Sequence, residues 1–192
     1  MSTMKIILLL MIGIFFLTCE NKLMNSPDPG TIDIYLKVVP GTWTIGDSDT
    51  LFVNLNQMAV YRADSVWSRI YRKLSDFRDK PLIINLFEKD SLGEFPVYEI
   101  GNTNLPPNVF TRLEFMFRIY NEMSYKGVKY PVVAADSIAG EAFGNIVKIH
   151  HTIEIKKNET TTIHLTLNLG ESLYRKFDSY VFAPKITVDE NL

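Results

Sequence analysis

The sequence predicts an all-β domain, built as an antiparallel, Greek-key-like β-sandwich with room for one short helix. Three observations lead to this fold class. Apolar and polar residues alternate with a period of two in several segments, which is typical of strands with one buried face. Turn residues separate these segments, and helical periodicity is weak throughout the chain. Many short strands divided by turns, without alternating helices, are typical of sandwiches.

The first half of the chain contains three predicted strands and one ambiguous segment. The apolar positions of the first strand are Ile32, Ile34, Leu36 and Val38. The second strand begins with Leu51, Val53 and Leu55 and runs on through Met58 and Val60. Residues 82–87 are apolar almost throughout, which predicts a strand covered on both faces. The best helix candidate is Ser65 to Asp79, although its β-branched and aromatic content also suits a strand.

The second half continues the alternation. After a turn at residues 105–108, a strand has its apolar positions at Leu113, Phe115, Phe117 and Ile119. In two late segments, 147–155 and 163–169, the apolar residues are at odd-numbered positions on both sides of the polar loop Lys156–Thr160. This parity predicts a hairpin with three or more loop residues and a register that pairs Ile153 with Ile163. Pro184 interrupts the last strand, which predicts an edge strand or a strand that switches sheets.

The N-terminus has the pattern of an export signal that ends at the only cysteine of the chain. Lys5 precedes an apolar run from Ile6 to Leu17, and Thr18 and Cys19 follow. The run is shorter than the roughly 18 residues expected of a membrane-spanning helix. We therefore expect residues 1–18 to be a lipoprotein signal peptide, residues 19–30 a lipidated cysteine with a flexible tether, and residues 31–192 a single β-sandwich domain.

The stretch Leu17-Thr18-Cys19 resembles the lipobox of bacterial lipoproteins, in which the cysteine thiol takes a diacylglycerol and the amino group is acylated after cleavage. Two acyl chains hold a protein stably on a bilayer, because each buried methylene contributes ~0.8 kcal/mol. The expected partner at Cys19 is therefore membrane lipid, through chains such as palmitate. The expected location is the bacterial cell envelope, with the outer membrane or cell surface preferred. An ordinary signal peptide with an incidental cysteine is the alternative.

Charge and motifs argue against several classes of function. The formal net charge of −2 at pH 7 makes nucleic acid an unsuitable partner, since its binding depends on Lys and Arg. The chain contains no G-x-S-x-G turn, glycine-rich phosphate loop or H-E-x-x-H motif. With Cys19 acylated, no thiol is left for catalysis or metal binding. We therefore expect no cofactor and no enzymatic activity.

The order of the predicted strands resembles a family of uncharacterised bacterial lipoprotein domains, known as a domain of unknown function. The segments that carry the resemblance are Val39-Pro40, Asn85-Leu86-Phe87, and residues 105–115, 163–169 and 180–186. Together they span nearly the whole domain. The resemblance implies an exported β-sandwich and no established activity. Val39, Asn108 and Asn168 depart from the family pattern, which has an acid, a glycine and an acid at these places.

The predicted ligand-binding residues are the two tryptophans, Trp43 and Trp67. Either could stack on a sugar or on an apolar peptide side chain. Trp43 is the stronger candidate, because it follows Pro40 in a loop, where core packing is harder to explain. Packing in the core or at its rim is the alternative, and aromatic residues in strands favour it.

Metal ligation is considered at two places. The predicted hairpin puts His150 and His164 diagonally across two strands, ~7 Å apart, with Glu154 nearby. These are weak candidates for zinc or copper, because a third ligand at fixed spacing is lacking. Asp47 and Asp49 could offer oxygen atoms to calcium, but an aspartate that bonds to its own turn is the preferred interpretation. We therefore expect no metal site.

The sequence thus predicts a membrane-anchored, exported lipoprotein that binds an unknown protein or glycan. Three alternatives remain open. A carbohydrate or surface-polymer adhesion module predicts an exposed tryptophan among polar groups. A hydrolase with an unrecognised site predicts a pocket with converging acids or histidines. A structural subunit of an envelope complex predicts a large exposed apolar patch or an unpaired sheet edge.

Overall fold

The fold is all-β, as the alternating pattern predicts. The computed structural model describes residues 28–70, 82–135 and 146–189 of the 192-residue chain. The strands in this part are β1 (Gly30–Val39), β2 (Thr50–Tyr61), β3 (Trp67–Ile70), β4 (Leu82–Asn85), β5 (Val97–Leu105), β6 (Asn108–Tyr125), β7 (Val128–Ala134), β8 (Ile146–Ile155), β9 (Thr160–Asn168), β10 (Leu173–Lys176), β11 (Ser179–Phe182) and β12 (Ile186–Val188). A one-turn helix, α2 (Leu169–Ser172), follows β9.

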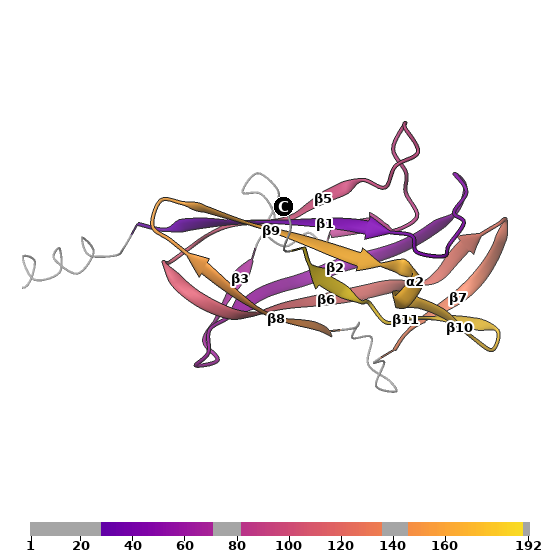
Figure 1. Cartoon of the computed structure of the whole chain (residues 1–192). Coiled ribbons are helices and arrows are strands. Elements are labelled where there is room, and N and C mark those ends of the chain that lie inside the picture. Colours follow the sequence, from indigo (N-terminus) through magenta and orange to yellow (C-terminus); the bar gives the residue numbers. More distant parts are fainter. Residues whose placement is uncertain (1–27, 71–81, 136–145, 190–192) are drawn as a thin grey trace, which may run out of the picture.

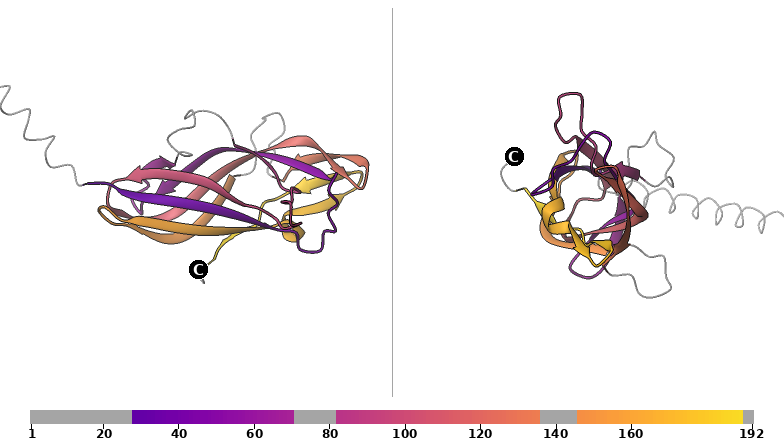
Figure 2. Two further views of the ribbon diagram at one scale, coloured as in Figure 1. Left: turned by 90° about the horizontal axis from the view of Figure 1, so that it is seen from above. Right: turned by 90° about the vertical axis from the view of Figure 1, so that its right-hand side faces the viewer.

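Two sheets form a sandwich. The smaller sheet has the strand order β12-β9-β1-β5. The larger sheet has the order β10-β11-β7-β6-β2-β3, with β4 also paired to β2 and β8 also paired to β6. The strands run along the long axis of the molecule, and the end-on view shows them surrounding one interior (Figures 1 and 2).

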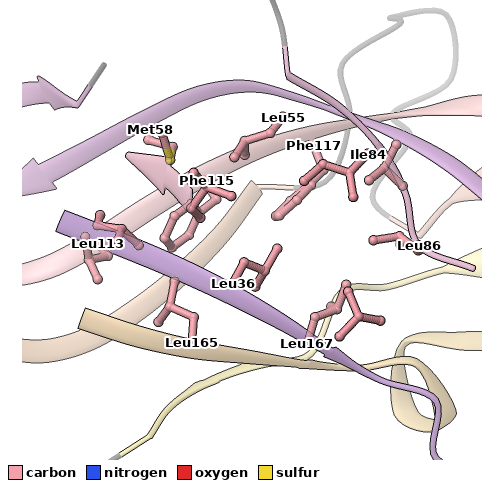
Figure 3. Packing of buried hydrophobic residues seen from close by; sticks show 14 of the residues in the cluster. Leu36, Leu55, Met58, Ile84, Leu86, Leu113, Phe115, Phe117, Leu165 and Leu167 are labelled. Atoms are coloured by element: carbon pink, nitrogen blue, oxygen red, sulfur yellow. The ribbon is translucent and has the colours of Figure 1, made fainter. Parts of the chain in front are cut away.

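The core lies between the two sheets and follows the predicted alternation. Leu36, Leu165 and Leu167 point inward from the smaller sheet toward Phe115 and Phe117 of the larger one (Figure 3). All five side chains are at most 1% exposed. Because successive side chains of a strand point to opposite faces, the residues between these positions form the outer faces of the sandwich.

A β-bulge explains why the buried positions of β2 change parity. Pairing between β2 and β6 shifts register between Leu55 and Gln57. The extra residue turns Met58 and Val60 inward, after Leu51, Val53 and Leu55 have pointed inward with the opposite parity. The outer face of β2 therefore carries Gln57, Ala59 and Tyr61 beyond the bulge.

The predicted hairpin register, Ile153 with Ile163, is wrong. Ile153 lies opposite Phe110, because β8 pairs with β6 in the larger sheet. Ile163 lies opposite Ile34, because β9 pairs in parallel with β1 in the smaller sheet. The turn between β8 and β9 crosses from one sheet to the other, so both apolar faces meet the same core from opposite sides. The common parity of the apolar residues in β8 and β9 means that both strands face one core. It does not mean that the two strands are hydrogen-bonded to each other.

The sheets are mixed, and this also differs from the expected antiparallel sandwich. Strands β1 and β9 are parallel, as are β7 and β11. The other ladders are antiparallel. Pro184 separates β11 in the larger sheet from β12 at the edge of the smaller sheet, which confirms the predicted change of sheet.

The helix candidate at residues 65–79 is wrong in its described part. Residues 67–70 form β3, which pairs with the end of β2, and residues 71–79 lie outside the described residues. The short helix of the fold is α2 instead. Its hydroxyl-bearing last residue, Ser172, donates a hydrogen bond to the carbonyl of Asn168 at 2.5 Å.

Gly30 begins β1, one residue before the expected domain start. A Cβ atom at this position would lie 2.1 Å from the carbonyl oxygen of Lys156, so only glycine fits. The amide of Thr31 donates to the carbonyl of Glu159, 2.9 Å away. The chain therefore enters the domain beside the turn between β8 and β9, at the end opposite the turn between β6 and β7 (Figure 1).

Candidate functional site

Trp67 is exposed at the edge of the larger sheet. It is the first residue of β3 and lies opposite Tyr61 of β2 in the ladder. Its exposed fraction is 51%, although large aromatic side chains are usually mostly buried. The two ring centroids are 6.4 Å apart, with planes inclined by 31°. The structure thus places this predicted ligand-binding residue on the surface, next to a second aromatic ring.

The ladder extends this pair into a row across four strands, which we call the Trp67 row. Tyr61 lies opposite Arg112 of β6, and Arg112 lies opposite His150 of β8. The guanidinium carbon of Arg112 is 4.2 Å from the centroid of the Tyr61 ring. A cation at this distance from a ring is attracted by the electron-rich face. The Trp67 row is therefore Trp67, Tyr61, Arg112 and His150.

An acid beside the row holds Arg112 in place. Glu114, two residues further along β6, has its Oε1 3.0 Å from Arg112 Nε and 3.8 Å from Lys148 Nζ. Arg112 Nε is buried and does not donate to this oxygen in hydrogen-bond geometry, so the contact is an ion pair. The guanidinium is thus fixed between a carboxylate and an aromatic ring.

The same surroundings raise the pKa of Tyr61. Burial raises the pKa of the Tyr61 hydroxyl, and the Glu114 carboxylate raises it further, while Arg112 opposes this. At neutral pH the row therefore presents a neutral phenol, an indole and a guanidinium. This chemistry suits binding by ring stacking and hydrogen bonding.

Trp43, the other predicted ligand-binding residue, packs at the rim of the core. Its ring centroid is 5.0 Å from that of Tyr125, 5.6 Å from Tyr180 and 6.0 Å from Phe87. The side chain is half-buried against the hydrophobic core. The rim interpretation is thus correct for Trp43.

A cavity of about 530 Å³ adjoins Trp43. Lys37, Lys89, Glu94 and Phe95 are among the residues that line it. Lys89 Nζ donates to the carbonyl of Ile45 at 2.6 Å, which ties the two loops around the cavity together. A second cavity, of about 360 Å³, lies between β8 and the segment before β12. Glu94 is the single acid that lines these two cavities among the described residues, and neither cavity is lined by a histidine.

Asp49 has a structural role. Its carboxylate accepts hydrogen bonds from the amide of Gly46 at 2.8 Å and from the amide of Lys126 at 2.6 Å. The side chain is buried, whereas Asp47 is exposed. The preferred interpretation, an aspartate that bonds to its own turn, is confirmed.

The proposed pairing of His150 with His164 is wrong, because the hairpin that would bring them together does not form. His150 lies on β8 in the larger sheet, and His164 lies on β9 in the smaller sheet. His164 stacks on Tyr35, with centroids 5.4 Å apart. Glu154 is exposed, 4.0 Å from Lys156 Nζ. Within the described ranges, no group of three or more metal-binding side chains comes together.

Sequence reasoning missed Tyr61 and Arg112. The local signal was present, because Arg112, Glu114 and Arg118 alternate with the apolar residues of β6 and so must share its outer face. Their partners on β2, β3 and β8 depend on the ladder, which the sequence does not show.

The fold and the row define an all-β domain with an exposed aromatic and cationic face. Comparison of the chain with protein-family models, curated proteins and solved structures found no match. In the described ranges, no helix has the length and apolar character that crossing a bilayer requires.

Proposed function

We propose that this protein is an exported, lipid-anchored protein of the bacterial envelope that binds a carbohydrate polymer through the Trp67 row. It works by display: the acyl chains on Cys19 hold the domain at a membrane, and the outer face of the larger sheet meets the ligand. The single observation that carries the binding role is the half-exposed Trp67 beside Tyr61 and Arg112.

The anchor is supported by the sequence. Cys19 lies outside the described residues, and the run before it has the length of an export signal. The described chain enters the domain at one end, where Pro29 and Thr31 form hydrogen bonds with the turn between β8 and β9. The resemblance to bacterial lipoprotein domains stays a prediction that agrees with this anchor.

Incorporation of radiolabelled palmitate into the full chain tests the anchor. We expect label in the wild type and none in Cys19→Ser. Equal labelling of both proteins, or recovery of the wild type from culture fluid with a free thiol, would contradict it.

The choice of carbohydrate follows from the chemistry of the row. Indole and phenol rings pack against the apolar faces of sugar rings, while their polar ends and a guanidinium reach the hydroxyl groups. An exposed tryptophan among polar groups is what the adhesion alternative predicts. The hydrolase alternative predicts converging acids or histidines, and the two cavities described above offer one acid.

Binding to immobilised polysaccharides tests the role of the row. With galactan, mannan and polygalacturonate as probes, we expect Trp67→Ala to weaken binding about thirtyfold, because an aromatic anchor is worth ~2 kcal/mol. Tyr174→Ala is the matched control, since Tyr174 is 48% exposed and lies on β10, outside the row. If none of these polymers binds, or if both variants lose binding equally, the proposed function is wrong.

A further inference from the structure

The outer face of the larger sheet is more basic than the chain as a whole. Between the Trp67 row and the next rows of the ladder, Arg69 and Lys148 flank Ala59 and Glu114, and Arg118 lies opposite Asn54. We call this surface, from the Trp67 row to Arg118, the basic face. Among the described residues it holds the cations Arg112, Arg118 and Lys148 and the acid Glu114, with Arg69, which has a partner of its own, at its edge. The whole chain has a formal net charge of −2.

The opposite face of the sandwich has the reverse balance. Three successive rows of the β1–β5 ladder on this side contain Asp33, Glu99 and Lys37, which are two acids and one cation. Asp189, at the edge of the same face, accepts a hydrogen bond from the Thr166 hydroxyl at 2.8 Å. Of these two described surfaces, the one that carries Trp67 therefore has the excess of positive charge.

At the margin of the basic face each cation is close to an acid, so their charges cancel. Arg62 pairs with Asp64 before β3, and Lys156 lies 4.0 Å from Glu154 after β8. Inside the basic face, Glu114 contacts both Arg112 and Lys148, so one negative charge is shared between two cations. Arg118 is exposed further along β6. The face thus keeps an excess of positive charge beside its aromatic rings.

The basic face is longer than one sugar ring. Arg112 and Arg118 are six residues apart on one strand, which is about 20 Å at ~3.3 Å per residue. A ligand that contacts both the Trp67 row and Arg118 must therefore be about 20 Å long, which is the length of several linked sugar rings rather than one.

We infer that the ligand of the basic face is an acidic polysaccharide, a chain of sugar rings that bears carboxylates. This inference rests on the proposed function and narrows its ligand. Sugar rings stack on the exposed Trp67, which Tyr61 supports, while carboxylates meet Lys148, Arg118 and the guanidinium of Arg112. A guanidinium suits a carboxylate, because its donors lie in one plane and match the two carboxylate oxygens.

The matched probes are polygalacturonate and its carboxyl-reduced form, which keeps the sugar backbone and loses the charge. Polyglutamate is the third probe, because it carries carboxylates without sugar rings. Binding is measured with the full-length, detergent-solubilised protein at low and at physiological salt. We expect tight binding of polygalacturonate alone, weakened by salt because exposed charges are screened.

Variants in which glutamine replaces a cation show which positive charges contribute to the binding of polygalacturonate. We expect Lys148→Gln and Arg118→Gln each to weaken polygalacturonate binding about fivefold, the upper range for an exposed ion pair. Lys37→Gln, on the opposite face, is the control and should bind like the wild type. Trp67→Ala should weaken binding of polygalacturonate as well.

Three outcomes would overturn the inference, and they separate it from the proposed function. Equal binding of polygalacturonate and its reduced form, with loss in Trp67→Ala, leaves the carbohydrate role intact and refutes the acidic ligand. Equal binding of polyglutamate, unchanged in Trp67→Ala, refutes both, since the face would then be a general polyanion surface. No binding of any of the three probes refutes the acidic ligand, and it refutes the proposed function as well if galactan and mannan also fail to bind.

Discussion

The carboxylate of Asp49 accepts a hydrogen bond from the backbone amide of Lys126, 2.6 Å away, although the two residues are 77 positions apart in the sequence. The other carboxylate oxygen accepts from the amide of Gly46 at 2.8 Å. One side chain thus joins the loop before β2 to the turn between β6 and β7. Asp49 is 3% exposed, so water cannot replace it.

We therefore expect Asp49→Ala to lower the free energy of unfolding by about 2 kcal/mol, because two amides lose their acceptor in a buried position. Asp47→Ala is the control, since Asp47 is exposed, and it should change stability by less than about 0.5 kcal/mol. Urea denaturation of the three proteins measures both values. Equal stability of Asp49→Ala and the wild type would show that the link is unimportant.

Tyr98 links the start of β5 to the end of β4. Its hydroxyl lies 3.2 Å from the carbonyl oxygen of Asn85 and 3.1 Å from Glu88 Oε2. Burial raises the pKa of the Tyr98 hydroxyl well above its ordinary value of 10.0, and the Glu88 carboxylate raises it further. The hydroxyl has one proton, which these two acceptors share, and we expect Tyr98→Phe to lower the free energy of unfolding by about 1 kcal/mol at pH 8, because this hydrogen bond is lost.

The pH dependence has a definite sign. Above pH 10 the unfolded chain releases the Tyr98 proton, while the folded protein keeps it, so the unfolded state binds fewer protons and stability falls as pH rises. The Tyr98→Phe variant has no hydroxyl at this position, so its stability does not fall through this ionisation. The stability difference between wild type and variant should therefore narrow from pH 8 to pH 11, as measured by denaturation at each pH. A constant or widening difference would contradict the assignment.

Gly30 fits where a side chain cannot. A Cβ atom there would lie 2.1 Å from the Lys156 carbonyl oxygen and 2.7 Å from a methyl group of Ile155. Gly30→Ala should lower the free energy of unfolding by about 2 kcal/mol, since the start of β1 must move away from this turn. In Gly46→Ala the nearest atom is 3.5 Å away, so that variant is the matched control. Thermal unfolding compares the two, and a harmless Gly30→Ala would count against the observed packing.

His150 and His164 lie in different sheets and should act independently. We expect the effects of His150→Ala and His164→Ala on stability to add within about 0.5 kcal/mol in the double variant. Added Zn²⁺ should leave the midpoint of thermal unfolding unchanged. Coupling above about 1 kcal/mol, or a stabilisation by Zn²⁺ that either variant abolishes, would revive the pairing of these two histidines.

Part of the candidate site could be predicted from the sequence, because the alternation shows which residues point outward from a strand. The alternation along β6 places Arg112, Glu114 and Arg118 on one face, and the exposed Trp67 was among the predicted ligand-binding residues. Which tryptophan would be exposed was not accessible. The two tryptophans differ in exposure. Trp43 lies in a loop that packs against the core, whereas Trp67 is the first residue of the edge strand β3.

The sequence by itself determined that β1, β2, β6, β8 and β9 are strands and where their buried residues lie, because the alternation of side chains is a local property of the extended backbone. It did not predict β5 or β7, and Ile83 of β4 is exposed although that strand was expected to be covered on both faces. Only the tertiary structure decided which strands are neighbours, because ladders join residues that are distant in the chain. Ile153 and Ile163 flank one turn and point into one core, yet Phe110 and Ile34 are their partners. The Trp67 row arises in the same way, from four strands whose register no single segment encodes.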